Sequence, residues 1–192
     1  AGLILHEMGA KVIAISDSSG GIYDPSGLDI PGIFEYAHEH RTIEGYSHSA
    51  KAITNEAILK LSCDFLIPAA LGSVIHHENV NDLQCKCIVE AANAPVTSNV
   101  VDRLYGHNIV VVPDILANAG GVCVSYFEWA QNIQGAEWSE EKINNTLDEK
   151  IISSFSDVVA LSKERGVNLR TAAYMIAIDR VVVASKLRGI IE

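Results

Sequence analysis

The stretch from Val112 to Trp129 holds the residues with the clearest potential for chemistry. It follows an apolar run, Ile109 to Val112, passes through a turn with Asn118, Gly120 and Gly121, and continues as an amphipathic segment. A turn of small residues beside aromatic side chains is a typical place for a ligand, because other molecules can approach its backbone closely. We therefore expect a binding site here. Gly120 and Gly121 have two interpretations: the backbone needs a positive φ there, or another group approaches it closely.

Small or polar residues also follow three other apolar runs of strand length. They are Asp17, after the run 11–16, Ala69 and Ala70, after the run 64–67, and Asn93, after the run 87–91. Ligands of open parallel sheets bind at the carboxyl ends of the strands, where connections reverse direction. These residues and Asn118 are therefore our candidates for a shared site.

Residue type alone leaves each candidate with two interpretations. Asp17 can accept hydrogen bonds from a ribose 2′-hydroxyl and repel a 2′-phosphate, or it can be a turn or cap aspartate. Asn93 and Asn118 offer the donors and acceptors that suit a carboxamide or a ribose, or they can be ordinary turn residues. Ala69 and Ala70 admit a flat ring close to the backbone, or they are simply small loop residues.

Strand-like and helix-like segments alternate along the first part of the chain. We predict strands at 11–16, 64–67, 87–91 and 109–112, and we expect the strand 64–67 to be buried and to end at Pro68. Asp29 should cap a helix through His40, with Ile33, Phe34 and Ala37 on its inner face. Continuous apolar strands between helices are typical of a parallel sheet covered on both faces. The expected fold is a doubly wound α/β domain.

Two long helices are predicted at the carboxy-terminal end. Ser139 can cap the first and Gly166 can end it. The second runs from about Leu169 to Leu187, with Val181 among the apolar residues of one side. Arg170 is expected on a solvated face, although a contact between domains is an alternative.

Composition excludes several classes of function. A formal charge of −10 without a basic stripe speaks against nucleic-acid binding. No apolar run approaches the ~18 residues of a membrane span, and the amino terminus has no signal-like pattern, so a cytoplasmic location is expected. The four cysteines include no C-x-x-C pair and the histidines lack zinc-site spacing. We expect reduced cysteines and no metal site.

Three long runs closely resemble the cofactor domain of the glutamate dehydrogenase family. They are Asp64 to Leu71 (DFLIPAAL), Val89 to Thr97 (VEAANAPVT) and Pro113 to Trp129 (PDILANAGGVCVSYFEW), and Ile15 to Tyr23 and Leu169 to Tyr174 match as well. Leucine, phenylalanine and valine dehydrogenases of the wider family share the Asn-Ala-Gly-Gly-Val run. The continuation Ser-Tyr-Phe-Glu-Trp is similar to the glutamate branch.

The resemblance implies a function and a set of site residues. The function is the NAD(P)-dependent, reversible oxidative deamination of L-glutamate to 2-oxoglutarate and ammonia. The cofactor would contact Asp17, Ser18, Ala69, Ala70, Asn93, Asn118 and Gly120, with the two asparagines at the nicotinamide ribose and carboxamide. Asp17 would favour NAD, although NADP is possible with an acid at this position. Val122 and Ser125, one helical turn apart, would face the substrate side chain.

The sequence departs from the family pattern at its start. In the family, a strand and a G-x-G-x-x-G/A turn precede the helix that begins here at Ala1, and the catalytic lysine and aspartate belong to an amino-terminal domain. We therefore expect residues 1–135 to form an incomplete Rossmann-like dinucleotide-binding domain lacking its first strand, with residues 136–192 as helices packed on it and reaching toward the substrate domain. No catalytic residue is assigned to this chain.

The departures and the resemblance together imply two further expectations. The isolated chain should be inactive, and the complete enzyme should be a homo-oligomer, a hexamer as is usual in the family. Two alternatives to a glutamate dehydrogenase are a leucine, phenylalanine or valine dehydrogenase and a non-enzymatic nucleotide-binding or assembly module.

Overall fold

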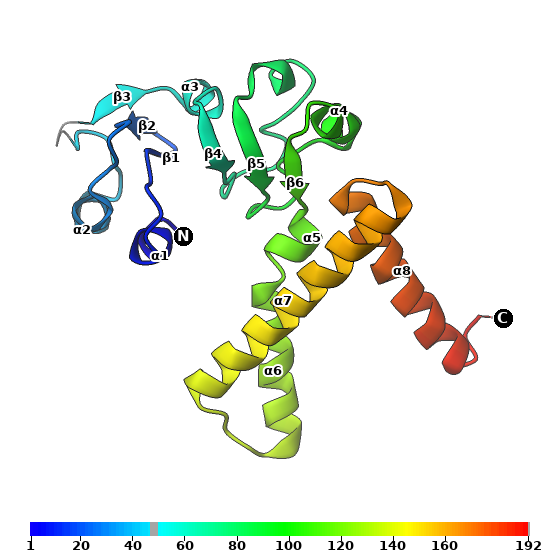
Figure 1. Cartoon of the computed structure of the whole chain (residues 1–192). Coiled ribbons are helices and arrows are strands. Elements are labelled where there is room, and N and C mark those ends of the chain that lie inside the picture. Colours follow the sequence, from blue (N-terminus) through cyan, green and yellow to red (C-terminus); the bar gives the residue numbers. More distant parts are fainter. Residues whose placement is uncertain (47–49, 192) are drawn as a thin grey trace. The chain divides into compact units, whose positions relative to one another are not determined.

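The chain folds into two compact units, shown in a computed structural model that describes residues 1–46 and 50–191 (Figure 1). The first unit comprises Ala1–Cys63 with Asp82–Gln84, and the second comprises Asp64–Asn81 with Cys85–Glu192. Each unit has its own sheet and its own helices.

The described residues of the first unit form a small antiparallel sheet and three helices. Its elements are α1 (Gly2–Glu7), β1 (Ala14–Asp17), β2 (Gly20–Tyr23), α2 (Ile30–His40), β3 (Lys51–Ile53) and α3 (Asn55–Leu59). β2 pairs antiparallel with both neighbours, and Ile15 lies opposite Ile22. Buried side chains of Ile22, Leu28, Ile30, Ile33, Ile43 and Tyr46 form its core. The strand expected at 11–16 is observed as β1 over 14–17, but its place in the predicted parallel sheet was wrong, because β1 pairs antiparallel with β2 of the following hairpin.

Local signals in the first unit mostly act as expected. Asp29 caps α2 by accepting a hydrogen bond from the Gly32 amide at 3.2 Å. The expectation for Phe34 was wrong, since 56% of its surface is exposed. Ile30 and Ile33 lie one turn apart and take the buried side of α2, which turns the adjacent Phe34 side chain away from the core.

The second unit is organised around a three-stranded sheet in the order β4-β5-β6. Its elements are β4 (Cys63–Leu66), the 3₁₀ turn η1 (Val80–Asp82), β5 (Cys85–Val89), the 3₁₀ turn η2 (Ser98–Val100), α4 (Val101–Gly106) and β6 (Val110–Val112). The three arrows run in one direction in Figure 1, and β5 and β6 pair in parallel with Ile88 opposite Val111. The predicted parallel sheet of an α/β fold is confirmed. Ile75, Ile88, Val96 and Leu104 are fully buried around it.

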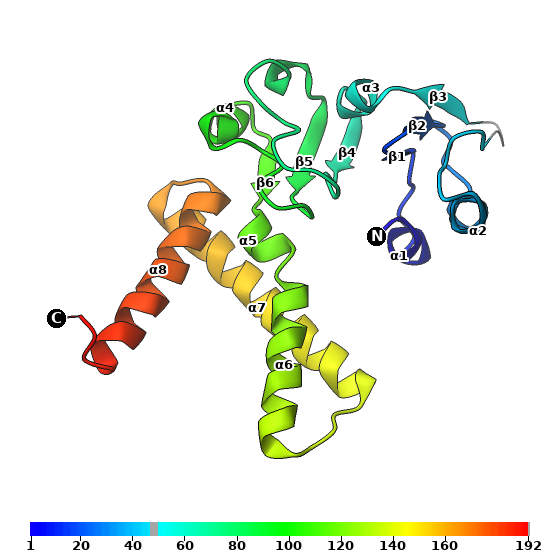
Figure 2. The ribbon, with the colours of Figure 1, turned by 180° about the vertical axis from the view of Figure 1, so that it is seen from behind.

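Four helices follow β6 in the part of the second unit that the structure describes, which ends at residue 191. They are α5 (Asp114–Ala117), α6 (Gly120–Gln134), α7 (Glu140–Arg165) and α8 (Leu169–Leu187). Ser139 caps α7, Gly166 ends it with a φ of +63°, and Asn168 caps α8, so both long helices have the predicted bounds. α7 crosses α6 in both views and packs against α8 (Figure 2). Leu116 of α5, Val158 of α7, and Ala172 and Ala173 of α8 form a shared core.

Two burial predictions in the second unit were wrong. Phe65 is 64% exposed, because β4 lies at the edge of the sheet and one of its faces is not covered within the described structure. Val181 is also exposed, since only the first turns of α8 pack into the shared core.

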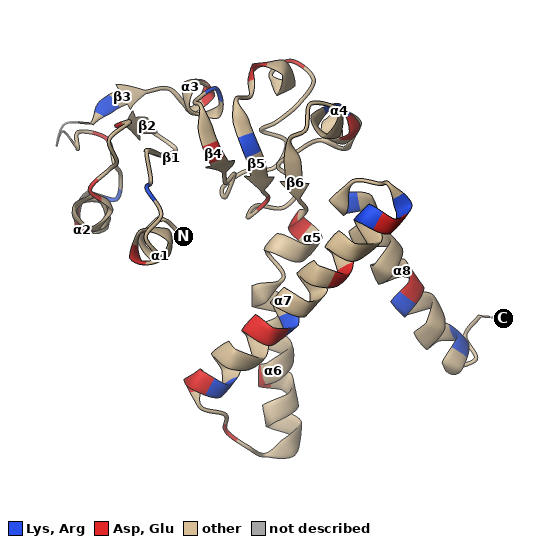
Figure 3. Ribbon diagram, in the orientation of Figure 1, with Lys and Arg blue, Asp and Glu red and all other residues tan. Residues whose placement is uncertain are grey.

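Charge is distributed unevenly over these helices (Figure 3): α7 carries many charged residues, whereas Glu128 is the single charged residue of α6. No helix among residues 1–46 and 50–191 has the length and apolar character to cross a membrane.

Candidate functional site

Three loops meet at the carboxyl ends of β4, β5 and β6, and backbone groups join them. The Ala92 amide donates to the Pro68 carbonyl at 2.9 Å, which links the loops after β5 and β4. The Ala94 amide donates to Asp114 Oδ2 at 2.8 Å, which links the loop after β5 to the start of α5. The sheet edge thus carries one connected surface, as the rule for open parallel sheets predicts.

Asn93 and Asn118 contact each other across this surface. Asn118 Nδ2 donates to Asn93 Oδ1 at 2.8 Å and, more weakly, to the Ala91 carbonyl at 3.4 Å. Among the described residues, no further protein hydrogen bond engages Asn93 Nδ2 or Asn118 Oδ1. The pair therefore presents one donor group and one acceptor side by side, which is the complement of a carboxamide.

Gly72 allows the loop after β4 to lie against the loop that carries Asn93. A Cβ atom at Gly72 would stand 3.0 Å from the Asn93 carbonyl oxygen and 3.5 Å from that of Ala94. The Ser73 amide donates to the Ala94 carbonyl at 2.8 Å, so the two backbones are fixed next to each other. Ala69 and Ala70 are exposed and lie between Pro68 and Gly72, both of which contact the loop after β5.

Glu90 lies beneath the loops and was not singled out by sequence reasoning. Its side chain is fully buried, where it accepts hydrogen bonds from the Val96 amide at 3.2 Å and the Asp114 amide at 2.9 Å. Burial raises the pKa of the Glu90 carboxyl, although these hydrogen bonds and the charge of Arg170 oppose the rise. The signal in the sequence is an acid directly after an apolar strand, where a charge must find partners if it is buried.

Arg170, in the first turn of α8, is the charged partner of Glu90. One terminal nitrogen of its guanidinium donates to Glu90 Oε1 at 2.5 Å and to the Val96 carbonyl at 3.5 Å. Only 15% of the Arg170 side chain is exposed. The expectation of a solvated arginine was wrong, because the start of α8 packs onto the loop after β5 instead of facing water.

The first turns of α6 contain the remaining candidates of this unit. Neither Gly120 nor Gly121 has a positive φ, so that interpretation was wrong. A Cβ at Gly121 would meet no protein atom within 4 Å, so the space beside this part of the helix is open. Val122, 70% exposed, and Ser125, also exposed, follow on α6 with one helical turn between them. Their side chains can be reached by a small molecule.

Asp17 belongs to the first unit, at the end of β1. Its carboxylate accepts four hydrogen bonds, from the Ser19 amide and hydroxyl, the Thr42 hydroxyl and the Ile43 amide. Partial burial would raise the pKa of Asp17, but the bonds from Ser19, Ile43 and Thr42 outweigh it and lower the pKa to about 2. Asp17 is therefore an ionised turn aspartate whose acceptor sites are used by the protein. Ser18, the next residue, is exposed.

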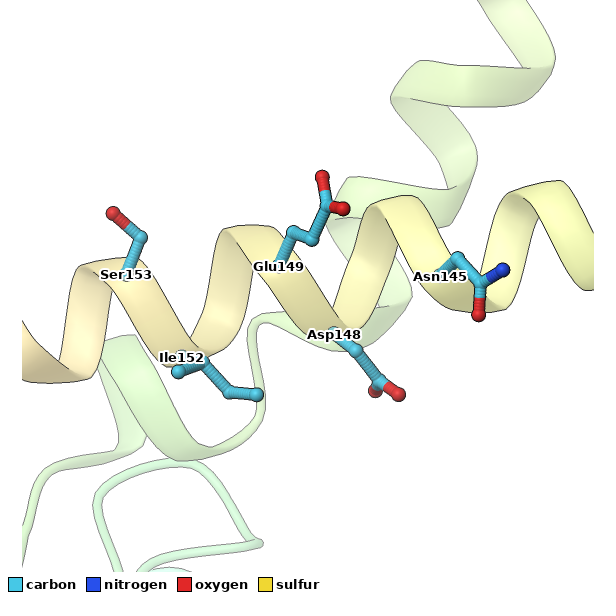
Figure 4. A pocket seen from close by; sticks show the side chains of 5 residues that line it. All are labelled: Asn145, Asp148, Glu149, Ile152 and Ser153. Atoms are coloured by element: carbon cyan, nitrogen blue, oxygen red, sulfur yellow. The ribbon is translucent and has the colours of Figure 1, made fainter.

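Other surface features offer less chemistry. A shallow depression on α7 is lined by the exposed side chains of Asn145, Asp148, Glu149, Ile152 and Ser153, all from one helix (Figure 4). None of its five lining residues is buried, and none belongs to the loops that carry Asn93 and Asn118. No group of three potential metal ligands occurs among the described residues.

Known proteins resemble the chain along its whole length. Residues 1–189 match the family model described as Glutamate/Leucine/Phenylalanine/Valine dehydrogenase. A glutamate dehydrogenase of Thermotoga maritima is 47% identical over 98% of this chain, and a cryptic catabolic NAD-specific glutamate dehydrogenase of Bacillus subtilis is 42% identical over 96%.

Solved structures agree with these relatives. The hetero-hexameric glutamate dehydrogenase of Thermus thermophilus, in a Leu-bound form, covers all of this chain with a TM-score of 0.90 at 26% identity. That of Peptoniphilus asaccharolyticus covers 97% with a TM-score of 0.78 at 33% identity. The chain spans only 43% to 45% of the length of these four proteins. The family match and the identities show that the chain belongs to the Glutamate/Leucine/Phenylalanine/Valine dehydrogenase family.

Proposed function

We propose that this chain is the cofactor-binding portion of an NAD(P)-dependent glutamate dehydrogenase. The reaction is the reversible oxidative deamination of L-glutamate to 2-oxoglutarate and ammonia. The observation that carries the proposal is the Asn93 and Asn118 pair at the carboxyl ends of β5 and β6, in a chain whose relatives are named NAD-specific glutamate dehydrogenases.

The asparagine pair fits the nicotinamide part of the cofactor. Their mutual hydrogen bond orients both amides before a ligand arrives, which lowers the ordering cost of binding. Asn93 Nδ2 can donate to the carboxamide oxygen or a ribose hydroxyl, and Asn118 Oδ1 can accept from the carboxamide nitrogen. Ala69, Ala70 and Gly120 have small side chains or none, so we propose that they leave room for the flat nicotinamide ring. The bound nicotinamide supplies hydride transfer, and this chain holds it in place.

Asp17 and Ser18 are proposed to lie at the adenosine ribose. The four internal hydrogen bonds keep Asp17 ionised, so its charge disfavours the 2′-phosphate of NADP. A direct bond from the ribose 2′-hydroxyl would replace one of those internal bonds. We therefore propose NAD as the preferred cofactor, with NADP as the weaker alternative.

Val122 and Ser125 are proposed to face the substrate side chain. A hydroxyl that donates to the distal carboxylate of glutamate contributes about 1.5 to 3 kcal/mol as a charged hydrogen bond. Leucine has no such acceptor, so Ser125 favours glutamate. No catalytic residue is assigned to this chain, and the proton transfers at the amino carbon are proposed to need residues outside it.

We also propose a domain organisation, an oligomeric state and a cellular location for the protein. Residues 1–135 are proposed as the dinucleotide-binding part and residues 136–192 as helices packed on it. We propose an oligomer of identical chains, a hexamer, and a cytoplasmic location. The hetero-hexameric Thermus thermophilus enzyme supports the number of subunits and not their identity.

A substrate panel on the enzyme that contains this sequence tests the proposal. The rate of NAD reduction should be highest with L-glutamate, compared with leucine, phenylalanine and valine. In Ser125→Ala, the ratio of kcat/KM for glutamate to that for leucine should fall by roughly tenfold to a hundredfold. Ser153→Ala is the matched control, because Ser153 is an exposed helical serine on α7.

Each alternative function predicts a different result. Highest activity with an apolar amino acid would favour a leucine, phenylalanine or valine dehydrogenase. Binding of NAD without turnover of any amino acid would favour a nucleotide-binding module. An unchanged substrate ratio in Ser125→Ala would remove Ser125 from the substrate site.

A further inference from the structure

We propose that Glu90 and Arg170 are positioning residues of the nicotinamide site, through which the start of α8 holds the loops of Asn93 and Asn118 in place. The inference rests on the proposed function, since it assigns these loops to the nicotinamide. It concerns two residues that touch neither ligand nor reacting atoms and act through their neighbours.

Glu90 is buried and is joined by hydrogen bonds to both loops. The Val96 amide, which binds Glu90 Oε1, lies three residues after Asn93 in the same loop. The Asp114 amide, which binds Glu90 Oε2, begins α5, and Asn118 follows the end of that helix. Each asparagine is therefore within one short loop or one short helix of a bond to the same carboxylate.

Arg170 fixes this carboxylate from a helix that is 80 residues distant in the sequence. Its contact with the Val96 carbonyl adds a second link to the loop of Asn93. The start of α8 is itself held, because Asn168 Nδ2 donates to Asp102 Oδ1 of α4 at 3.0 Å. The Glu90 and Arg170 ion pair therefore joins the asparagine loops to the start of α8, which is itself hydrogen-bonded to α4.

The incomplete hydrogen bonding of the Glu90 and Arg170 ion pair indicates that it positions the asparagine loops rather than stabilising the fold. Arg170 uses one terminal nitrogen, and its Nε is buried without a hydrogen-bond partner in the described part of the chain. A buried ion pair with incomplete hydrogen bonding stabilises a fold weakly compared with an apolar replacement. Its defined geometry, by contrast, orders the two loops.

The test compares Arg170→Met with Arg180→Met in the complete enzyme. Arg180 lies on the same helix and pairs with Asp157 in an exposed bridge at 3.4 Å, so it is a matched control for charge and location. Affinity is measured for NADH and for ADP-ribose, which is the cofactor without its nicotinamide ring. We expect Arg170→Met to weaken NADH binding about tenfold, the value of one or two hydrogen bonds, and to change ADP-ribose binding by less than about threefold. Arg180→Met should change neither.

Two further measurements separate positioning from general damage. Amide hydrogen exchange should accelerate in Arg170→Met in peptides that contain Val96 and Asp114, whose amides bind Glu90. Arg170→Lys should restore most of the NADH affinity, since a single charged donor can replace the single nitrogen that Arg170 uses.

The outcomes discriminate between the two proposals. Equal losses of NADH and ADP-ribose affinity, or unchanged exchange of the Val96 and Asp114 amides, would overturn the positioning role. A wild-type enzyme that binds neither ligand would overturn the proposed function, and the exchange of the two amides would still decide whether Arg170 orders the loops.

Discussion

Replacing Gly72 by alanine should disturb the asparagine loops by a predictable amount. The new Cβ would stand 3.0 Å from the Asn93 carbonyl oxygen, whereas nonbonded contacts of this kind prefer about 3.5 Å or more. Gly72 itself has no positive φ, so alanine is allowed by its backbone. The effect therefore comes from the contact with Asn93 and not from strain at residue 72.

The surrounding bonds decide which side moves and how much it costs. Ser73 and Ile75 donate backbone hydrogen bonds to Ala94 and Pro95 at 2.8 and 2.9 Å, so the two loops separate only if these weaken. Overpacking of this kind costs about 1 to 3 kcal/mol. The lower entropy of the unfolded chain offsets about 0.4 to 1 kcal/mol of it. We expect Gly72→Ala to lower the free energy of unfolding by roughly 1 to 2 kcal/mol.

Gly106→Ala is the matched control for this prediction. A Cβ at Gly106 would meet no atom within 4 Å, and its φ is not positive, so this change should leave stability unchanged or raise it by roughly 0.5 to 1 kcal/mol. Urea unfolding of both variants, together with NADH affinity, measures the two effects. Equal stability changes in the two variants, or full NADH affinity in Gly72→Ala, would refute the reasoning about the Asn93 loop.

The remaining predictions concern carboxylates and one helix cap. Asp17→Asn should raise the ratio of NADP to NAD activity, whereas Asp24→Asn should not, although Asp24 makes the same two hydrogen bonds to a serine two residues later. The pKa of Asp17 is lowered from 3.8 to about 2, so its ionised form stabilises the fold above pH 3.8 and this contribution disappears as the pH falls toward 2. The contribution should be on the order of 1 kcal/mol after solvent screening, and acid unfolding of Asp17→Asn against wild type measures it. Ser139→Ala should lower stability by about 1 kcal/mol through loss of the α7 cap, and Ser153→Ala should not, as thermal unfolding would show.

Local sequence signals predicted most of the framework. Asp29, Ser139 and Gly166 mark helix ends through hydrogen bonds or backbone angles that depend on a few neighbouring residues. The run 87–91 before Asn93 overlaps β5, and the run 109–112 before Asn118 contains β6. Both were recognisable because a buried parallel sheet needs continuous apolar segments. The convergence of these two asparagines then follows from the geometry of a parallel sheet, and the structure shows their direct contact.

Predictions that depended on distant partners were less successful. Phe34 and Phe65 are exposed because burial depends on which face another element covers, and periodicity does not reveal that. Arg170 lies in a polar-looking stretch at a helix start, but its partner is 80 residues away in the loop after β5. Sequence patterns therefore predicted that Asn93 and Asn118 lie at the same edge of the sheet and missed the ion pair of Glu90 and Arg170.

Asp17 of the first unit and Glu90 of the second unit show opposite balances between burial and hydrogen bonding. Four donors lower the pKa of the partly exposed Asp17, so its ionised form favours the folded state at neutral pH. Burial raises the pKa of Glu90 despite two amides and Arg170, so its ionised form favours the unfolded state relative to an ordinary glutamate. The Asp17 carboxylate therefore contributes to stability in a way that the Glu90 carboxylate does not. Glu90 instead joins both asparagine loops to the start of α8, which is the geometry from which we infer its positioning role.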